Sequence, residues 1–156
     1  MHNAIAVAMS GGVDSSAAAW LLQQEGYSPT GLTLSLFRPE DLAPGREGAC
    51  RALEDLADAR RVAAQLGIPH HTLDLREAFA RQVMDPFVRE YEAGRTPNPC
   101  VVCNRTIKFG AMLEEAEKLD LPLLATGHYA QVERDGGSGR VLLKQALDLS
   151  KDQSYV

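Results

Sequence analysis

The stretch from Asn3 to Ser16, NAIAVAMSGGVDSS, constrains the fold of this chain more than any other segment. The small and apolar residues from Ala4 to Ala8 are typical of a short buried strand. The run breaks at Ser10-Gly11-Gly12 and continues from Asp14 as a predicted helix. Adjacent glycines allow positive φ and leave no Cβ in the way of a bound group. Because the free N–H groups and the positive dipole end of a helix follow directly, this turn is suited to bind an anion.

The polar side chains around the glycines add to this prediction. Ser10, Ser15 and Ser16 offer hydroxyl groups, and Asp14 either caps the helix or helps to hold Mg²⁺. The simpler interpretation is a tight strand-to-helix turn with an aspartate N-cap. The string SGGVDSS is more specific than a single glycine motif, although it lacks the lysine of a Walker loop. We therefore favour a phosphate-binding turn.

Composition is that of an ordinary globular protein. The 156 residues are 45% apolar and 24% charged, which is enough for one domain over residues 1–156 with a core of its own. Sixteen basic and twenty-one acidic residues give a net charge of −5, which argues against nucleic-acid binding by bulk charge but allows a local basic patch. We find no secretion signal and no long apolar run, so we expect a cytoplasmic protein without a membrane partner.

Strand-like and helix-like patterns alternate along the rest of the chain. They predict an α/β fold, a Rossmann-like parallel sheet with helices on both faces, followed by a terminal β-hairpin. The further predicted strands cover residues 30–37, 70–75 and 121–126, with the hairpin at 129–134 and 140–145. The further predicted helices cover 50–66, 77–91 with an interruption at Pro86, and 105–118. Residues 38–48 are a predicted mobile loop and residues 94–104 a predicted proline-rich loop.

Two predicted strand ends carry residues suited to a binding site. SGGVDSS follows the first strand, and Thr126-Gly127-His128 follows the strand over 121–126. In parallel α/β sheets, ligands bind beyond the carboxyl ends of the strands. We therefore expect both segments to face one pocket, although more than a hundred residues separate them.

Cys100 and Cys103 form a Cys-x-x-Cys pair just before a predicted helix, where thiols have a lowered pKa. A structural zinc site needs four ligands, and the sequence has no second pair of this kind. A thioredoxin-like redox pair is expected after the first strand of its fold. Two interpretations stay open: an iron–sulfur cluster with a third ligand from Cys50 or another chain, or a nucleophilic or persulfide-carrying cysteine with a resolving partner.

Several independent segments together resemble one family, the tRNA-specific 2-thiouridylases, which are PP-loop ATP pyrophosphatases. These segments follow the family order along nearly the whole chain: SGGVDSS, LLQQEGY, LEDLADARRVAAQLGIPHHTLD, GRTPNPCVVCNRTIKF, ATGHYA and LDLSKDQSY. The resemblance implies ATP- and Mg²⁺-dependent adenylation of C2 of the wobble uridine in tRNA. It also implies replacement of that oxygen by sulfur from a cysteine persulfide, supplied by a persulfide carrier or a cysteine desulfurase relay.

The resemblance assigns roles position by position. Cys103 would be the first catalytic cysteine, with Cys100 and Asp14 as further catalytic candidates. Asp14 is also the candidate Mg²⁺ ligand, and Cys100 and Cys103 are the candidate ligands of an iron–sulfur cluster. The residues implied at the target base are Asn98, Pro99 and Cys100, and those implied at tRNA are His128, Lys151, Asp152 and Gln153. The residues implied at ATP are Ala8, Met9, Ser10, Gly11, Gly12, Val13, Asp14, Ser15, Leu34 and Gly127.

The chain departs from the family pattern in three places. Cys100 stands where the family commonly has aspartate, which favours a cluster as in other tRNA-thiolating PP-loop enzymes. Leu34 stands where the family often has methionine, and both are apolar. The family continues well beyond residue 156, with a second catalytic cysteine and tRNA-binding domains. We therefore interpret the chain as an N-terminal part, truncated at its C-terminal end.

Two other functions stay open at the level of sequence. A PP-loop ligase acting on a small molecule would share the phosphate loop but would have no need of the thiol pair. A truncated chain would bind ATP or tRNA without completing sulfur transfer. Four basic residues are candidate RNA phosphate contacts or simply solvated surface: Arg95, Arg105, Lys108 and Lys151.

Overall fold

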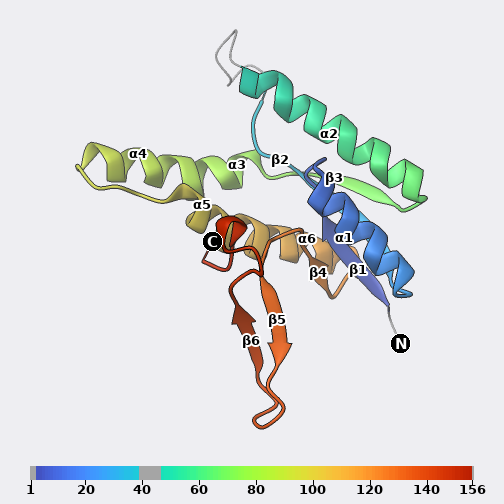
Figure 1. The fold of residues 1–156 in the computed structure, drawn as a ribbon. Coiled ribbons are helices and arrows are strands. Elements are labelled where there is room, and N and C mark those ends of the chain that lie inside the picture. The colour runs from blue at the N-terminus through green and yellow to red at the C-terminus, as the bar shows by residue number, and fades with distance from the viewer. Residues whose placement is uncertain (1–2, 39–46, 156) are drawn as a thin grey trace.

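A four-stranded parallel sheet forms the centre of the computed structural model, which describes residues 3–38 and 47–155 (Figure 1). The strands lie in the order β3-β2-β1-β4, so that β1 has a parallel neighbour on each side. Val7 of β1, for example, pairs with Gly31 of β2 and with Ala125 of β4. The bounds are β1 (Ala4–Ala8), β2 (Ser28–Ser35), β3 (His70–Asp74) and β4 (Leu124–Ala125). The predicted parallel α/β class is confirmed.

Helices cover both faces of the sheet because the side chains of β1 alternate between them. Val7 and Met9 pack on one face against α1 (Val13–Gln24) and α2 (Glu47–Leu66). Ala6 packs on the opposite face against α6 (Met112–Lys118), whose Met112 and Ala116 are fully buried. This is the two-sided burial that a nearly continuous apolar strand predicts.

The predicted helix over 77–91 is a continuous helical run with a π-helical segment in its middle. The run consists of α3 (Arg76–Phe79), η2 (Ala80–Met84) and α4 (Asp85–Glu92). Pro86 lies in the first turn of α4, directly after the π-helical turn. Because proline has no N–H group for the preceding carbonyl, the regular hydrogen-bond ladder is interrupted just before it, as predicted.

A second helical run begins earlier than predicted. It consists of α5 (Pro99–Cys103), the π-helix η3 (Asn104–Ala111) and α6. The prediction of a loop over 94–104 is therefore wrong for its second half. Asn98 is the N-cap: its Oδ1 accepts hydrogen bonds from the backbone N–H of Cys100 at 3.1 Å and of Val101 at 3.3 Å. Pro99 suits the first position of a helix, where no N–H donor is needed.

The predicted hairpin is confirmed and projects away from the sheet (Figure 1). Strands β5 (Gln131–Arg134) and β6 (Val141–Lys144) pair antiparallel, with Val132 opposite Leu143. The chain then returns towards the sheet through the short 3₁₀ helix η4 (Leu149–Lys151). This return brings the last residues back to the sheet end where the first helix begins.

Three further expectations can be compared with the structure. Helix α1 begins at Val13 with Gly12 as N-cap and no side-chain capping bond, so the capping role considered for Asp14 is wrong. Strand β2 is shifted two residues towards the N-terminus, and β4 is shorter than predicted. Most of the loop predicted over 38–48 lies outside the described residues. No helix within 3–38 and 47–155 is both long enough and apolar enough to cross a bilayer.

Candidate functional site

The loop between β1 and α1 has a backbone shape that only glycine allows. Gly11 has φ +82°, in the left-handed region that favours glycine. A Cβ on Gly11 would lie 2.3 Å from the backbone carbonyl oxygen of Asp55 in α2. The back of the loop is therefore pressed against α2, and its open side faces the end of the sheet.

Serine hydroxyl groups hold this loop in place. Ser15 is buried, and its Oγ donates to the carbonyl of Gly12 at 3.1 Å and accepts from the backbone N–H of Ser10 at 3.2 Å. Ser16 Oγ donates to the same Gly12 carbonyl at 2.8 Å. These bonds fix the start of α1, whose N-terminal N–H groups and dipole favour an anion.

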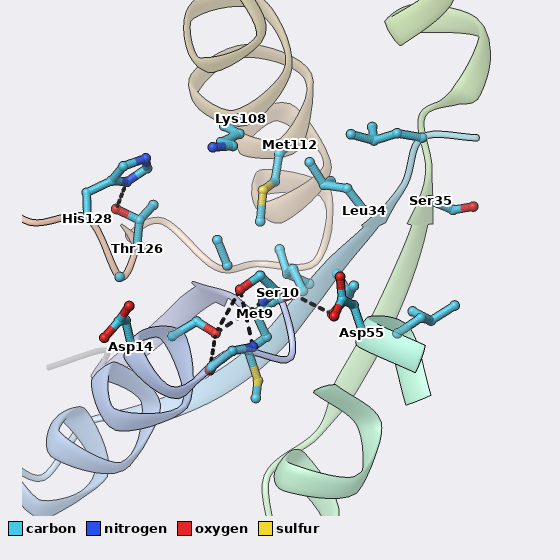
Figure 2. Close-up of a pocket in the computed structure, with 18 of the residues that line it drawn as sticks. Met9, Ser10, Asp14, Leu34, Ser35, Asp55, Lys108, Met112, Thr126 and His128 are labelled. Carbon is cyan, nitrogen blue, oxygen red and sulfur yellow. Dashed lines mark hydrogen bonds between the residues drawn. The ribbon is translucent and has the colours of Figure 1, made fainter. Parts of the chain in front are cut away.

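A cavity of about 480 Å³ opens at this end of the sheet (Figure 2). Its volume lies within the range of about 300–1,000 Å³ that is common for small-molecule sites. Ten of the residues implied at ATP or tRNA line it: Ala8, Met9, Ser10, Gly12, Asp14, Ser15, Leu34, Gly127, His128 and Gln153. Gly11 of the loop and Val13, the first residue of α1, do not line the cavity.

The two predicted strand ends meet at this cavity. A Cβ on Gly127 would lie 2.8 Å from the backbone nitrogen of Ser15 and 2.9 Å from the carbonyl carbon of Asp14. The chain after β4 therefore rests directly on the first turn of α1, which requires glycine at this contact. The expectation that both segments face one pocket is confirmed.

One wall of the cavity is apolar, and two hydrogen-bonded side chains, Thr33 and His70, lie behind the glycine loop. Leu34, Phe37 and Met112 contribute to the wall. Behind the loop, Thr33 Oγ1 donates to the carbonyl of Met9 at 2.8 Å and lies 2.8 Å from His70 Nε2. Because the threonine hydrogen is used by Met9, the His70 ring nitrogen is the donor to Thr33. The polar loop and the apolar wall thus face one another across the same space.

Tyr129 connects the end of the chain to the first turn of α1. Its hydroxyl donates to Asp14 Oδ1 at 2.8 Å. This hydrogen bond and the negative charge of Asp14 raise the pKa of Tyr129, with a further contribution from Asp148. Its backbone N–H donates to the side-chain Oε1 of Gln153 at 3.0 Å, and its carbonyl accepts from the backbone N–H of Gln153 at 2.9 Å. The segment after the hairpin therefore reaches the cavity through Gln153, which lines it.

A basic and aromatic group lies at the other side of the cavity. His128 Nδ1 lies 2.7 Å from Thr126 Oγ1, and its ring centroid lies 5.9 Å from that of Phe109. Burial and then the positive charge of Lys108 lower the pKa of His128. Figure 2 shows Lys108 and His128 approaching one another from η3 and from the segment after β4.

The two cysteines lie at the start of the helical run that carries Lys108. Cys100 is exposed, whereas Cys103 is half-buried against the apolar cluster of Phe79, Val83 and Ile107. Burial raises the pKa of the Cys103 thiol, and this outweighs the opposing charge of Lys108. The expectation of a lowered pKa is therefore wrong for Cys103. Neither cysteine lines the cavity.

The remaining predicted residues do not line the cavity. Asn98 is the N-cap of α5 and Pro99 its first residue, and the ammonium of Lys151 lies 5.3 Å from the centre of the Tyr129 ring. Asp152 Oδ1 accepts from the backbone N–H of Ala146 at 2.8 Å, so its carboxylate stabilises the chain after the hairpin. In the described part of the chain, no three metal-binding side chains lie together.

Sequence reasoning missed several lining residues: Thr33, Asp55, Leu56 and Met112. It also missed the contact between Tyr129 and Asp14, which are 115 residues apart. The alternating pattern of β2 could have indicated Thr33, because Thr33 lies on the same face of the strand as Ser35, which also lines the cavity. No local signal marks Asp55, whose position depends on how α2 packs behind the loop.

Comparison with curated proteins shows extensive similarity to one group. The tRNA-specific 2-thiouridylase MnmA of Heliobacterium modesticaldum is 48% identical over 155 residues, which is 99% of this chain and 40% of that protein. The enzyme of the same name from Beijerinckia indica is 52% identical over 151 residues, which is 97% of this chain and 35% of that protein. The chain thus spans less than half of the length of these relatives.

Among solved structures, the chain is similar to the "predicted subunit of tRNA methyltransferase" of Methanocaldococcus jannaschii, with a TM-score of 0.49 at 22% identity, covering 87% of this chain and 56% of that chain. NMN synthetase of Francisella tularensis gives a TM-score of 0.48 at 19% identity, covering 79% of this chain and 44% of that chain. The sequence model described as "tRNA methyl transferase HUP domain" matches residues 3–156, which is nearly the whole chain, and the chain therefore belongs to this family.

Proposed function

We propose that this chain is the ATP-binding and adenylating part of a tRNA-uridine 2-sulfurtransferase. The observation that carries the proposal is the cavity between the SGGVDSS loop and Gly127, which is also lined by Lys108 of the helical run that begins with the Cys100–Cys103 helix. Relatives named as tRNA-specific 2-thiouridylases match almost the whole chain at 46–52% identity. Because the chain spans less than half of those proteins, the complete activity and its partners belong to the proposal.

The first step would be adenylation of the target base. ATP would place its phosphates at the loop of Ser10 to Ser15 and its adenine against the apolar wall that includes Leu34. The O2 atom of the wobble uridine attacks the α-phosphorus, and pyrophosphate leaves. Oxygen-bound AMP is a far better leaving group than the original oxygen, so C2 becomes open to a sulfur nucleophile.

Mg²⁺ fits the residues at this site. The carboxylate-bearing residues Asp14 and Asp55 both line the cavity, and Mg²⁺ is typically bound by one or two carboxylates together with phosphate oxygens and water. Asp14 is the ligand that the sequence predicts. When bound, Mg²⁺ would offset the negative charge of the triphosphate.

The second step would transfer sulfur. A persulfide on Cys103, loaded by a persulfide carrier or a cysteine desulfurase relay, attacks C2 with its terminal sulfur, and AMP leaves. A second thiol then attacks Cys103 Sγ, which releases 2-thiouridine and forms a disulfide that an external thiol must reduce. Cys100 and a cysteine of the remainder of the protein are the two candidates for this second thiol.

An iron–sulfur cluster fits these residues less well. Such clusters are usually bound by four cysteines, and related centres by at least three protein ligands. Cys100 and Cys103 are the only two cysteines whose side chains the structure describes. A cluster would therefore need ligands from elsewhere in the protein or from a partner.

Binding of tRNA would use the surface around the same opening. His128 and Gln153 line the cavity, Lys151 lies over the Tyr129 ring, and Asn98 is the N-cap of the helix of the cysteines. With a net charge of −5, the chain would rely on these local contacts and on the target base rather than on overall charge.

The test measures 2-thiouridine and pyrophosphate in one reaction with unmodified tRNA, ATP, Mg²⁺ and a sulfide source. Thiolation that disappears in Cys103→Ser would support both steps in this chain. Pyrophosphate release that needs tRNA, without thiolation, would support adenylation and assign sulfur transfer to the missing part. Pyrophosphate release that needs a small molecule in place of tRNA would contradict the proposal and favour a small-molecule ligase. ATP binding without 2-thiouridine or pyrophosphate would mean that this chain binds ATP but catalyses neither step.

A further inference from the structure

The phosphate loop has no cation of its own. SGGVDSS contains neither lysine nor arginine, whereas a Walker loop places a lysine directly on the phosphates of its nucleotide. The lining of the cavity also includes Asp14 and Asp55, whose negative charges oppose the binding of a triphosphate. Apart from Mg²⁺, positive charge at this site would therefore have to come from another part of the chain.

Lys108 is the one lysine or arginine among the described residues that line the cavity. It comes from η3, on the face of the sheet opposite α1, and approaches the cavity near His128 and Met112 (Figure 2). Its side chain is half-buried, so its ammonium is partly withdrawn from bulk water. Such a charge interacts more strongly with an anion than a fully solvated one does.

Lys108 lies in the π-helix η3, and Met112, four residues later at the start of α6, also lines the cavity. Residues four apart lie on the same side of a helix. This side of the helical run therefore faces the cavity.

Two of the other basic residues considered for phosphate contacts have partners outside the cavity lining. Arg95 forms an ion pair with Glu90, and Lys151 lies over the Tyr129 ring. The positive charge of Lys108 acts on a residue of the site, since it helps to lower the pKa of His128. Lys108 thus lies among the residues that line the cavity.

We infer that Lys108 is a nucleotide-binding residue that supplies the cavity with the ammonium group its phosphate loop lacks. This inference rests on the proposed ATP site and adds a residue to it. Lys108 would bind the phosphate chain from the side opposite the loop, so that the anion lies between the α1 N-terminus and η3. It would also stabilise the negative charge that develops as pyrophosphate leaves.

The test compares the binding of ATP, ADP, AMP and adenosine to the wild-type chain, Lys108→Gln and Lys108→Arg by isothermal titration calorimetry. Loss of a charged hydrogen bond predicts that Lys108→Gln weakens ATP binding roughly 10- to 100-fold. The loss should shrink from ATP to AMP and vanish for adenosine, and Lys108→Arg should recover part of the affinity. Lys118→Gln is the matched control, because it removes an exposed lysine, paired with Glu115, from the same helical run. It should bind ATP like the wild type.

The outcomes separate the two proposals. If the wild type binds ATP and Lys108→Gln binds it equally well, the inference is overturned while the ATP site stands. An equal loss for ATP and adenosine would assign Lys108 a structural role and would also overturn it. If the wild type binds no ATP, both proposals fail. The melting temperature of each variant shows whether a loss of binding arises from unfolding.

Discussion

Gly127 is the residue on which the closure of the cavity depends most directly. Its Cα faces the backbone of α1 so closely that a Cβ would lie 2.8 Å from Ser15 N. Gly127→Ala should therefore push the β4 end away from α1 or strain both, lowering the free energy of unfolding by about 1–3 kcal/mol. Urea denaturation measures this loss, and ATP affinity should fall with it.

Gly136→Ala is the matched control for this substitution. Gly136 lies in the turn of the hairpin, and a Cβ there meets no atom within 4 Å. Its free energy of unfolding should stay within about 0.5 kcal/mol of the wild type, as is usual at exposed positions. Equal losses at both glycines would show that the close approach at Gly127 is not the cause.

A second prediction at this scale concerns the titration of Tyr129. Because its phenolate would lie beside the Asp14 carboxylate, its pKa is raised, and Asp14→Asn should lower it towards the ordinary tyrosine value. The stabilising effect of this hydrogen bond is fully present below the ordinary tyrosine pKa and is lost as the pH rises through the raised pKa. NMR of labelled tyrosine rings follows the titration, with Tyr129→Phe to assign the signal. An unchanged pKa in Asp14→Asn would mean that the bond does not persist in solution.

At the scale of elements, the N-cap at Asn98 supports the helix that carries both cysteines. Asn98→Ala removes the acceptor for two backbone N–H groups and should lower the free energy of unfolding by about 1 kcal/mol. Asn98→Asp and Asn98→Ser keep an acceptor oxygen and should lose much less. Chemical denaturation of the three variants is the measurement, and a similar loss in all three would show that the cap is not the stabilising feature.

This helix also shows where prediction from sequence stops. The strand of Ala4–Ala8 and the buried face of Ile107, Met112 and Ala116 could be predicted, because each follows from a local apolar period. The start of α5 differs from the prediction because prolines are typical of loops, whereas Pro99 after Asn98 is also a typical helix start. The predicted direction of the Cys103 pKa shift was wrong, because the burial of this thiol against Phe79 and Val83 depends on tertiary packing.

At the scale of the whole molecule, the meeting of two strand ends could be predicted from topology alone, since all parallel strands end at the same edge. Lys108 and Tyr129 could not be placed in the same way. Lys108 lines the cavity from the π-helix η3, and Tyr129, between β4 and β5, contacts Asp14 at the start of α1. The periodicity of the sequence indicates neither of these two positions.

Because the cavity is built from segments far apart in the chain, its ligand should stabilise the entire fold. A ligand that binds only the folded state at a hundred times its Kd raises the free energy of unfolding by about 2.7 kcal/mol. ATP should therefore shift the melting temperature upward, whereas adenosine at the same concentration should shift it less if phosphate contacts dominate. Differential scanning fluorimetry measures both shifts. No shift at saturating ATP would contradict nucleotide binding in this cavity.

The division of the cavity between the two halves of the chain has a consequence for fragment complementation. A cut in the exposed backbone at 94–97, between α4 and α5, would leave the glycine loop on the first fragment and both Lys108 and Gly127 on the second. Neither fragment alone would hold the complete cavity. Nucleotide binding would then report reassembly of the sheet, since β4 must pair again with β1 before the two halves enclose one ligand.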